Sequence, residues 1–228
     1  MVRGAFPIFS SVSQNASIQT LTINSPVGAF GLRELGLAMK LTGVQQQGDF
    51  GMRMAMNGLT VPQVLLPPWS RDLVPTDLVL DLRANGYDLQ AALEEILSVM
   101  RANVRPDESK AAGERAVYAL APDGKVKIAL GPSQFVSKLL AITFEGEMTI
   151  TKPLARGRFV IKARGVNEAI ASLEAAAATD PTAEKVQIFL MEAKKFGNAE
   201  PDGSFSWVVE NPDGGLPRVN GQALPGGR

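Results

Sequence analysis

Acidic side chains are the first candidates for chemistry, because the chain of 228 residues contains no histidine and no cysteine. The absence of these two residue types excludes a Ser-His-Asp triad, a Cys-His dyad, thiolate metal ligands and disulfides. Acid–base catalysis would then depend on Asp, Glu, Lys or Tyr. The paired carboxylates are Asp77 with Asp81, Glu94 with Glu95, and Glu145 with Glu147.

Glu145 and Glu147 have the best spacing of these pairs. Two residues apart on one strand, they share a face at a separation of about 7 Å, which suits a shared proton or a metal ion. A solvated strand surface produces the same pattern, and we favour it because no second polar cluster converges on the pair in the sequence. We therefore expect no catalytic residue, no metal ligand and no cofactor, and predict that the chain is not an enzyme.

Glycine and arginine motifs give no stronger signal. The glycines of residues 43–58 have neither the Walker spacing nor a strand–GxGxxG–helix context. Arg156 and Arg158, with Lys152 and Lys162, could grip phosphate. Alternating basic residues are also typical of a sheet edge protected against aggregation, and we favour that interpretation. Interface residues are expected at Arg156, Arg158, Lys162 and Trp207.

Charge and hydropathy limit the possible partners. The 23 basic and 23 acidic residues give no net charge, so a nucleic-acid partner is not indicated. No run of 18 apolar residues is present, and residues 1–9 lack the apolar core of a secretory signal, so we expect neither a membrane span nor a signal peptide. Residues 101–164 are nevertheless basic and residues 165–228 acidic. This asymmetry suits self-assembly, although a mixed solvated surface would also account for it.

Side-chain periodicity predicts a β-rich chain with one main helix. Alternation predicts strands at 17–23, 31–41, 76–83, 138–151 and 156–164, and hairpins at 52–66 through Asn57-Gly58 and at 116–130. We expect the methionines at 52, 54 and 56 to pack in a core, in preference to forming a flexible binding surface. After Asp88 as N-cap, apolar residues spaced by three and four predict a helix over 89–100 that packs on Leu78, Leu80 and Leu82.

The second half is expected to contain a short helix, two strands and a tail. Asn167 is expected to cap an Ala-rich helix ending near Thr179, and residues 184–196 and 204–210 to pair as strands. Residues 198–228 are rich in Gly and Pro, so we expect a tail without a core of its own. The predicted fold class is α+β, with a β-rich mixed sheet core, one main amphipathic helix and an extended Gly/Pro-rich C-terminal tail. The expected segments are 1–70 (β-rich), 71–165 (strand–helix–β core), 166–197 (helix and strand) and 198–228 (tail).

Residues 76–164 resemble the core of the LysM-type baseplate adaptor proteins of contractile phage tails and contractile injection systems. The resemblance depends on these positions: Leu80, Asp81, Asp88, Gly131, Phe144 and 153–156. The LysM module of that family is not seen after Arg164. The resemblance implies a structural virion protein that links the central hub or tube to wedge or sheath in a symmetric multi-copy assembly, with other tail or baseplate proteins as partners. Its implied location is the virion tail or an assembled extracellular particle made in the host cytoplasm.

Two alternatives remain open at this point. A tail-tube or tube-completing subunit would use strands 138–151 and 156–164 to pair with its neighbours. A small enzyme would use Glu145 and Glu147.

Overall fold

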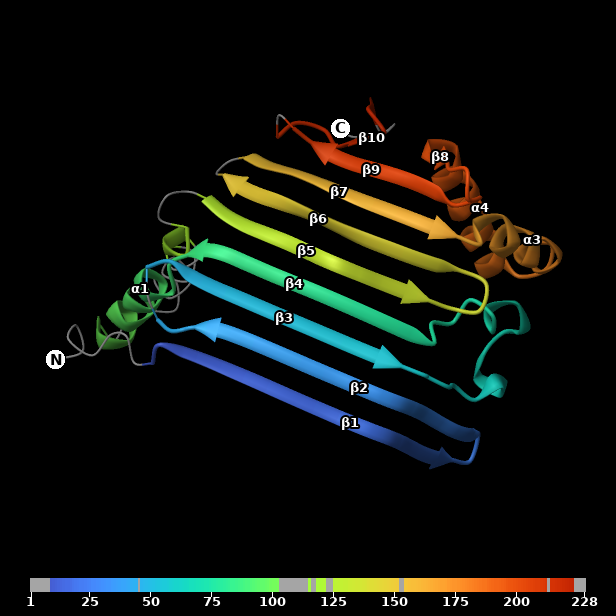
Figure 1. The fold of residues 1–228 in the computed structure, drawn as a ribbon, viewed down its shortest axis with the longest axis horizontal. Coiled ribbons are helices and arrows are strands. Elements are labelled where there is room, and N and C mark those ends of the chain that lie inside the picture. Colours follow the sequence, from blue (N-terminus) through green and yellow to red (C-terminus); the bar gives the residue numbers. More distant parts are fainter. Residues whose placement is uncertain are drawn as a thin grey trace.

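All described strands of the protein lie in one antiparallel sheet (Figure 1). The computed structural model describes residues 9–44, 46–102, 115, 118–121, 125–151, 154–212 and 214–223. The long strands are β1 (Ser11–Ser25), β2 (Gly28–Thr42), β3 (Gly48–Asn57), β4 (Asp77–Tyr87), β5 (Lys125–Val136), β6 (Ala141–Thr151), β7 (Leu154–Arg164) and β9 (Phe205–Asn211). The short strands β8 (Asn198–Ala199), β10 (Arg218–Val219) and β11 (Gln222–Ala223) complete the sheet beside β9. From β1 to β7 the order in the sheet is the order in the chain.

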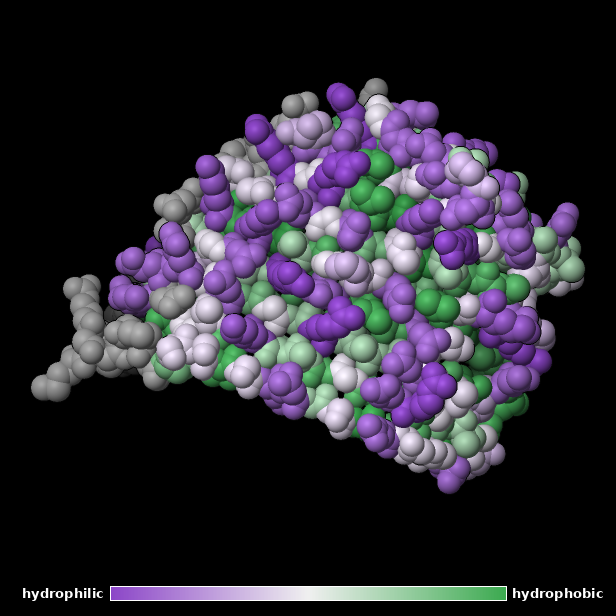
Figure 2. Space-filling view, viewed as in Figure 1, coloured by the Kyte–Doolittle hydropathy of each residue, from purple (hydrophilic) through white to green (hydrophobic). Residues whose placement is uncertain are grey.

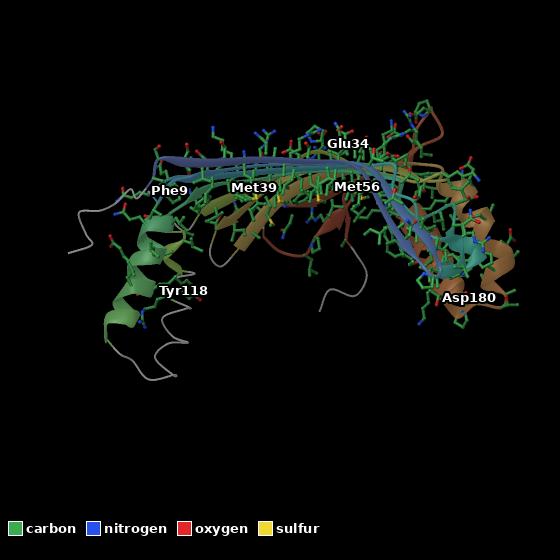
Figure 3. The ribbon with its side chains drawn as sticks, turned by 90° about the horizontal axis from the view of Figure 1, so that it is seen from below. Phe9, Glu34, Met39, Met56, Tyr118 and Asp180 are labelled. Atoms are coloured by element: carbon green, nitrogen blue, oxygen red, sulfur yellow. The ribbon has the colours of Figure 1, made fainter. Side chains whose placement is uncertain are left out.

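The helices stand at the two ends of the strands and project to the same side of the sheet (Figures 1 and 3). Helix α1 (Leu89–Ala102) is at one end, and α3 (Val166–Ala177) and α4 (Pro181–Phe196) are at the other. Short 3-10 turns at Gln63–Leu65 and Pro68–Ser70 join β3 to β4. Among the described residues no helix lies across the middle of the sheet.

Two aspartates cap the N-termini of helices, Asp88 for α1 and Asp180 for α4. The Oδ1 atom of Asp88 accepts the backbone N–H of Ala91 at 2.8 Å and starts α1. The Oδ1 atom of Asp180 accepts the N–H groups of Thr182 at 2.8 Å and Ala183 at 3.3 Å, with Pro181 as the first residue of α4. Such caps satisfy backbone donors that have no partner within the helix.

The fully buried core is small and lies at the α3–α4 end. Its main cluster contains Leu140, Ala163, Val166, Ala169 and Phe205, and Leu173 on α3 is also completely buried. A compact monomer of this mass exposes about 10,000 Å², whereas this chain exposes 14432 Å². Among the described residues no second layer covers the middle of the sheet, and this open face contributes to the excess.

A buried carboxylate fixes the irregular pairing of β4 with β5. The carboxylate of Asp81 contacts Arg83 Nε at 3.1 Å and Arg53 Nη1 at 3.4 Å. Its backbone N–H donates to Ser133 Oγ at 3.0 Å, where the register of both β4–β5 and β5–β6 shifts. A Cβ atom on Gly131 would lie 2.8 Å from Asp81 Cγ, so a larger residue does not fit beside this carboxylate.

Over the described residues, the structure confirms the α+β, β-rich fold class; all strand pairs there are antiparallel, and α1, α3 and α4 take the place of one main helix. The strands predicted from alternation at 17–23, 31–41 and 76–83 correspond to β1, β2 and β4, and those at 138–151 and 156–164 to β6 and β7. Helix α1 and its Asp88 cap are also confirmed. The turn of the hairpin predicted at 116–130, residues 122–124, lies outside the described residues.

Helix α1 does not pack where expected. It stands beyond the end of β4 at Tyr87 (Figure 1), whereas Leu78, Leu80 and Leu82 lie in the half of β4 that begins at Asp77. Ile96 is accordingly 45% exposed. The apolar stripe predicted the helix correctly but could not say which surface receives it.

Three predicted elements are wrong. Residues after Asn57-Gly58 form no return strand apart from a single bridge at Thr60, although Gly58 has the expected positive φ. Tyr118 is helical and not in a strand. Residues 184–196 belong to α4, because the Asp180 cap and Pro181 start a helix that overrides the local alternation.

The predicted tail and the Asn167 cap are wrong as well. Residues 198–223 extend the sheet, and Ser204, Phe205 and Val219 are buried. Gly165, with no side-chain cap, precedes α3 in place of Asn167.

Replacing Leu173 by Ala should lower the free energy of unfolding by about 2 to 5 kcal/mol, because the side chain is completely buried. Urea denaturation would measure the change. Ile96→Ala on exposed α1 is the matched control and should change the free energy by no more than about 0.5 kcal/mol. Equal effects of the two variants would contradict the small core at the α3–α4 end.

Candidate functional site

One face of the sheet is apolar across eight strands. Because side chains alternate between faces along a strand, each row of paired residues belongs to a single face. One row runs from Ile18 through Leu35, Met56, Leu78, Phe135, Ile142 and Ala163 to Phe205. A second row contains Met39, Met52, Leu82 and Leu130.

The apolar face is the one toward which the helices project. In Figure 3, Met39 and Met56 lie on the helix side of the sheet and Glu34 lies on the other side. Figure 2 shows the opposite face, where hydrophilic side chains spread across the sheet between scattered apolar residues. The three alternating methionines of β3 lie half-buried on the apolar face. They are absent from the buried core, so the expected core packing is wrong.

A pocket of about 410 Å³ opens on the apolar face beside α4. Its floor is formed by β6, β7 and β9, and its wall by α4. The lining residues are Leu140, Ile142, Phe144, Ile161, Ala163, Val166, Phe189, Leu190, Ala193, Phe196, Trp207, Val209 and Val219. No polar atom of the described residues lines this pocket.

The indole of Trp207 ties the pocket floor to its wall. Its Nε1–H donates to the backbone carbonyl of Ala193 on α4 at 2.6 Å. Its ring lies 6.3 Å from that of Phe205, centroid to centroid. The single polar group of this side chain is therefore satisfied, and the ring presents an apolar surface.

The four predicted interface residues are divided between the two faces. Arg156, Arg158 and Lys162 lie on the polar face, paired across β6 with Thr149, Glu147 and Thr143. Trp207 pairs with Ile161 on the apolar face. Strand β7 is paired on both sides, so its basic residues do not protect a sheet edge, and that interpretation is wrong.

Lys162 is held in an ion pair with Asp202. Its Nζ lies 3.1 Å from Asp202 Oδ2, and Arg164 Nη2 lies 3.4 Å from the same oxygen. Hydrogen bonds from the side chain and backbone N–H of Ser204, together with Lys162, lower the pKa of the Asp202 carboxyl.

Glu145 and Glu147 lie on the polar face, and no third described acidic residue forms a cluster with them. Glu147 Oε2 is 2.7 Å from Lys127 Nζ, and both side chains are about half exposed. Glu145 borders a hollow that also contains Arg53 and Lys162. The pair is thus surrounded by cations, and the described residues include no cluster of three potential metal ligands.

Strand β1 is a free sheet edge. Among the described residues it pairs only with β2, and nearly all of its side chains are exposed. Its sequence contains no charged residue and no proline, the features that usually prevent an edge from pairing with another chain. At Thr20 the backbone has a positive φ of 57°, and near Glu34 the sheet bends toward the helix side (Figure 3).

The opposite edge is covered. Strand β9 pairs on its outer side with β8 at one end and with β10 at the other. Between them, Asn220 accepts the N–H of Val208 at 2.8 Å and donates from Nδ2 to Ser206 O at 3.2 Å. Among the described strands, β1 is therefore the one long strand with a free edge, since the outermost strands on the other side, β8 and β11, have two residues each.

No protein-family model, curated protein or solved structure matches this chain. In the described part of the chain, no helix is long and apolar enough to span a bilayer. Its function is therefore inferred from the geometry of its own residues.

Sequence reasoning selected Trp207 but missed the pocket around it. The alternation within each strand shows that one face is apolar, yet only the strand order brings Phe144, Ile161 and Trp207 side by side. The cap signal of Asp180-Pro181 could have revealed α4, which forms the wall.

The free energy of unfolding should fall as the pH drops below about 4, because the folded state holds the pKa of Asp202 below its usual 3.8. A carboxyl whose pKa is lowered by folding stabilises the protein above its unfolded pKa and loses that effect as it is protonated. Asp202→Asn should therefore be less stable than the wild type at pH 6, and the difference should shrink toward pH 2. Urea midpoints between these values would measure it; a difference that is independent of pH would contradict the assignment.

Proposed function

We propose that this chain is a non-enzymatic structural subunit that assembles with a second copy of itself through β1. The supporting observation is the free edge of β1, which is 15 residues long and lacks charge and proline. An unpaired edge presents a row of backbone donors and acceptors that another strand can satisfy. Its exposed apolar residues, Val12, Ile18, Leu21 and Ile23, would lose solvent contact on pairing.

The pairing would be two-fold and antiparallel. With β9 covered by β8 and β10, the described strands offer a neighbour no second long free edge, because the outermost strands β8 and β11 have two residues each. An interface between two copies of the same edge is self-complementary and closes at two subunits. Two sheets joined in this way place their apolar faces on the same side.

The wider role that we propose is that of a baseplate adaptor in a contractile phage tail or injection machine. It rests on the resemblance of residues 76–164, in which Asp81 packs against Gly131 and Asp88 caps α1. A two-fold pair is a unit that larger symmetric particles can incorporate. The alternative of a tail-tube subunit has less support, since β6 and β7 are both paired within the sheet and a ring requires two different free edges.

The absence of cysteine gives a direct test of β1 pairing. Single cysteines at Gln14, Ala16 and Ile18 should form intermolecular disulfides under mild oxidation, with yields that peak at the position nearest the two-fold axis, where the Cα atoms are about 4.4 to 6.8 Å apart. The wild-type chain should sediment at twice the 24.3 kDa of one chain.

Ile18→Lys should reduce that mass to one chain, because a charge on the edge opposes pairing. Ile188→Lys on α4 is the matched control, since the two isoleucines are 44% and 51% exposed, and it should stay dimeric. A monomeric wild type at about 100 μM, or an equal response of both lysine variants, would rule out the proposed interface.

Changing Glu145 and Glu147 together to Gln should leave the sedimentation mass and the urea midpoint unchanged, because the exposed Glu147–Lys127 pair contributes at most about 1 kcal/mol. The same variant tests the enzyme alternative in the assembled particle. Normal assembly with loss of particle activity would replace the structural role by a catalytic one.

A further inference from the structure

We infer that the pocket between α4 and the sheet binds one acyl chain of a free fatty acid. This inference is independent of the β1 interface. It rests on the chemistry of the lining, the size of the pocket and the exposure of one aromatic side chain at its wall.

The lining excludes groups that need hydrogen bonds from the interior of the pocket. A peptide segment entering the pocket would carry N–H and C=O groups that no lining atom can satisfy, and burying such groups without partners is costly. The indole N–H of Trp207 is already bonded to Ala193 O, so it is not available to a ligand. A hydrocarbon chain requires no hydrogen bond and fits such a lining.

The pocket volume fits a chain of medium length. At about 30 Å³ for a group the size of one water molecule, the 410 Å³ would hold about 14 methylenes. Apolar cavities of only about 150 Å³ already bind small hydrocarbons. The rows of Phe144, Ile161 and Trp207 and of Ile142 and Ala163 supply a continuous floor along which such a chain can lie.

Phe189 marks the mouth of the pocket. It lines the pocket, yet it is 70% exposed, which is unusual for a side chain of this kind. A ligand that filled the pocket would cover part of this ring.

Binding can be measured with palmitate as the probe. Isothermal titration calorimetry and native mass spectrometry should show one palmitate per chain. In a series of saturated fatty acids from 8 to 18 carbons, affinity should rise about fourfold per methylene and level off near 14 to 16 carbons. No palmitate binding, or equal affinity along the series, would overturn the inference.

The site can be located with the two tryptophans of the chain. In the Trp69→Phe variant, Trp207 is the only indole, and a brominated fatty acid should quench its fluorescence. Phe189→Asp should weaken palmitate binding by about tenfold or more, because it places a charge at an apolar mouth. Met191→Asp is the matched control, because Met191 is 46% exposed on the same helix and does not line the pocket.

A second variant tests the pocket at Ala193, a half-buried residue of its wall, in place of an exposed position. Ala193→Phe should fill part of the pocket and shift the length at which affinity levels off to shorter chains. An unchanged length dependence, or equal binding by the Phe189 and Met191 variants, would place the ligand elsewhere. Binding to phosphatidylcholine vesicles without binding of free palmitate would replace the fatty acid by a lipid surface.

Discussion

The alternation of apolar and polar side chains along eight neighbouring strands is the constraint on which the rest of the structure depends. In most antiparallel domains a second layer covers the apolar face that such alternation produces. Here the helices stand at the two ends of the strands, and the main buried cluster lies at the end where α3 and α4 meet the sheet. The main packing contacts are therefore at one end of the sheet, and the described residues leave the middle of its apolar face uncovered.

The contacts on the polar face keep the sheet ordered although its apolar face is open. The polar face is held by specific contacts, of which the Asp81 carboxylate between Arg53 and Arg83 is the most buried. These contacts give the sheet a fixed register without a second layer, since a shift of one residue would move Asp81 to the apolar face.

The features that were predictable from the sequence are those that depend on local pattern. Alternation in β2, β4 and β7 and the Asp88 cap of α1 needed no knowledge of neighbours. Residues 184–196 were misassigned because Val186 and Ile188 fit both periods, and the deciding signal lay upstream at Asp180. The surface that receives α1, the free edge of β1 and the pocket beside Trp207 all depend on strand order, which alternation within a strand does not encode.

Strand order also determines when each part of the sheet can form. Because β1 to β7 follow one another in the sheet as in the chain, each new strand can add to the one synthesised just before it, although the β3–β4 and β4–β5 connections are longer than the others. The β1–β2 hairpin is complete once residue 42 has left the ribosome, whereas the strands that cover the β9 edge are made last. Two nascent chains on one messenger thus expose matching edges long before either has buried its core, so that pairing during translation would precede completion of the monomer.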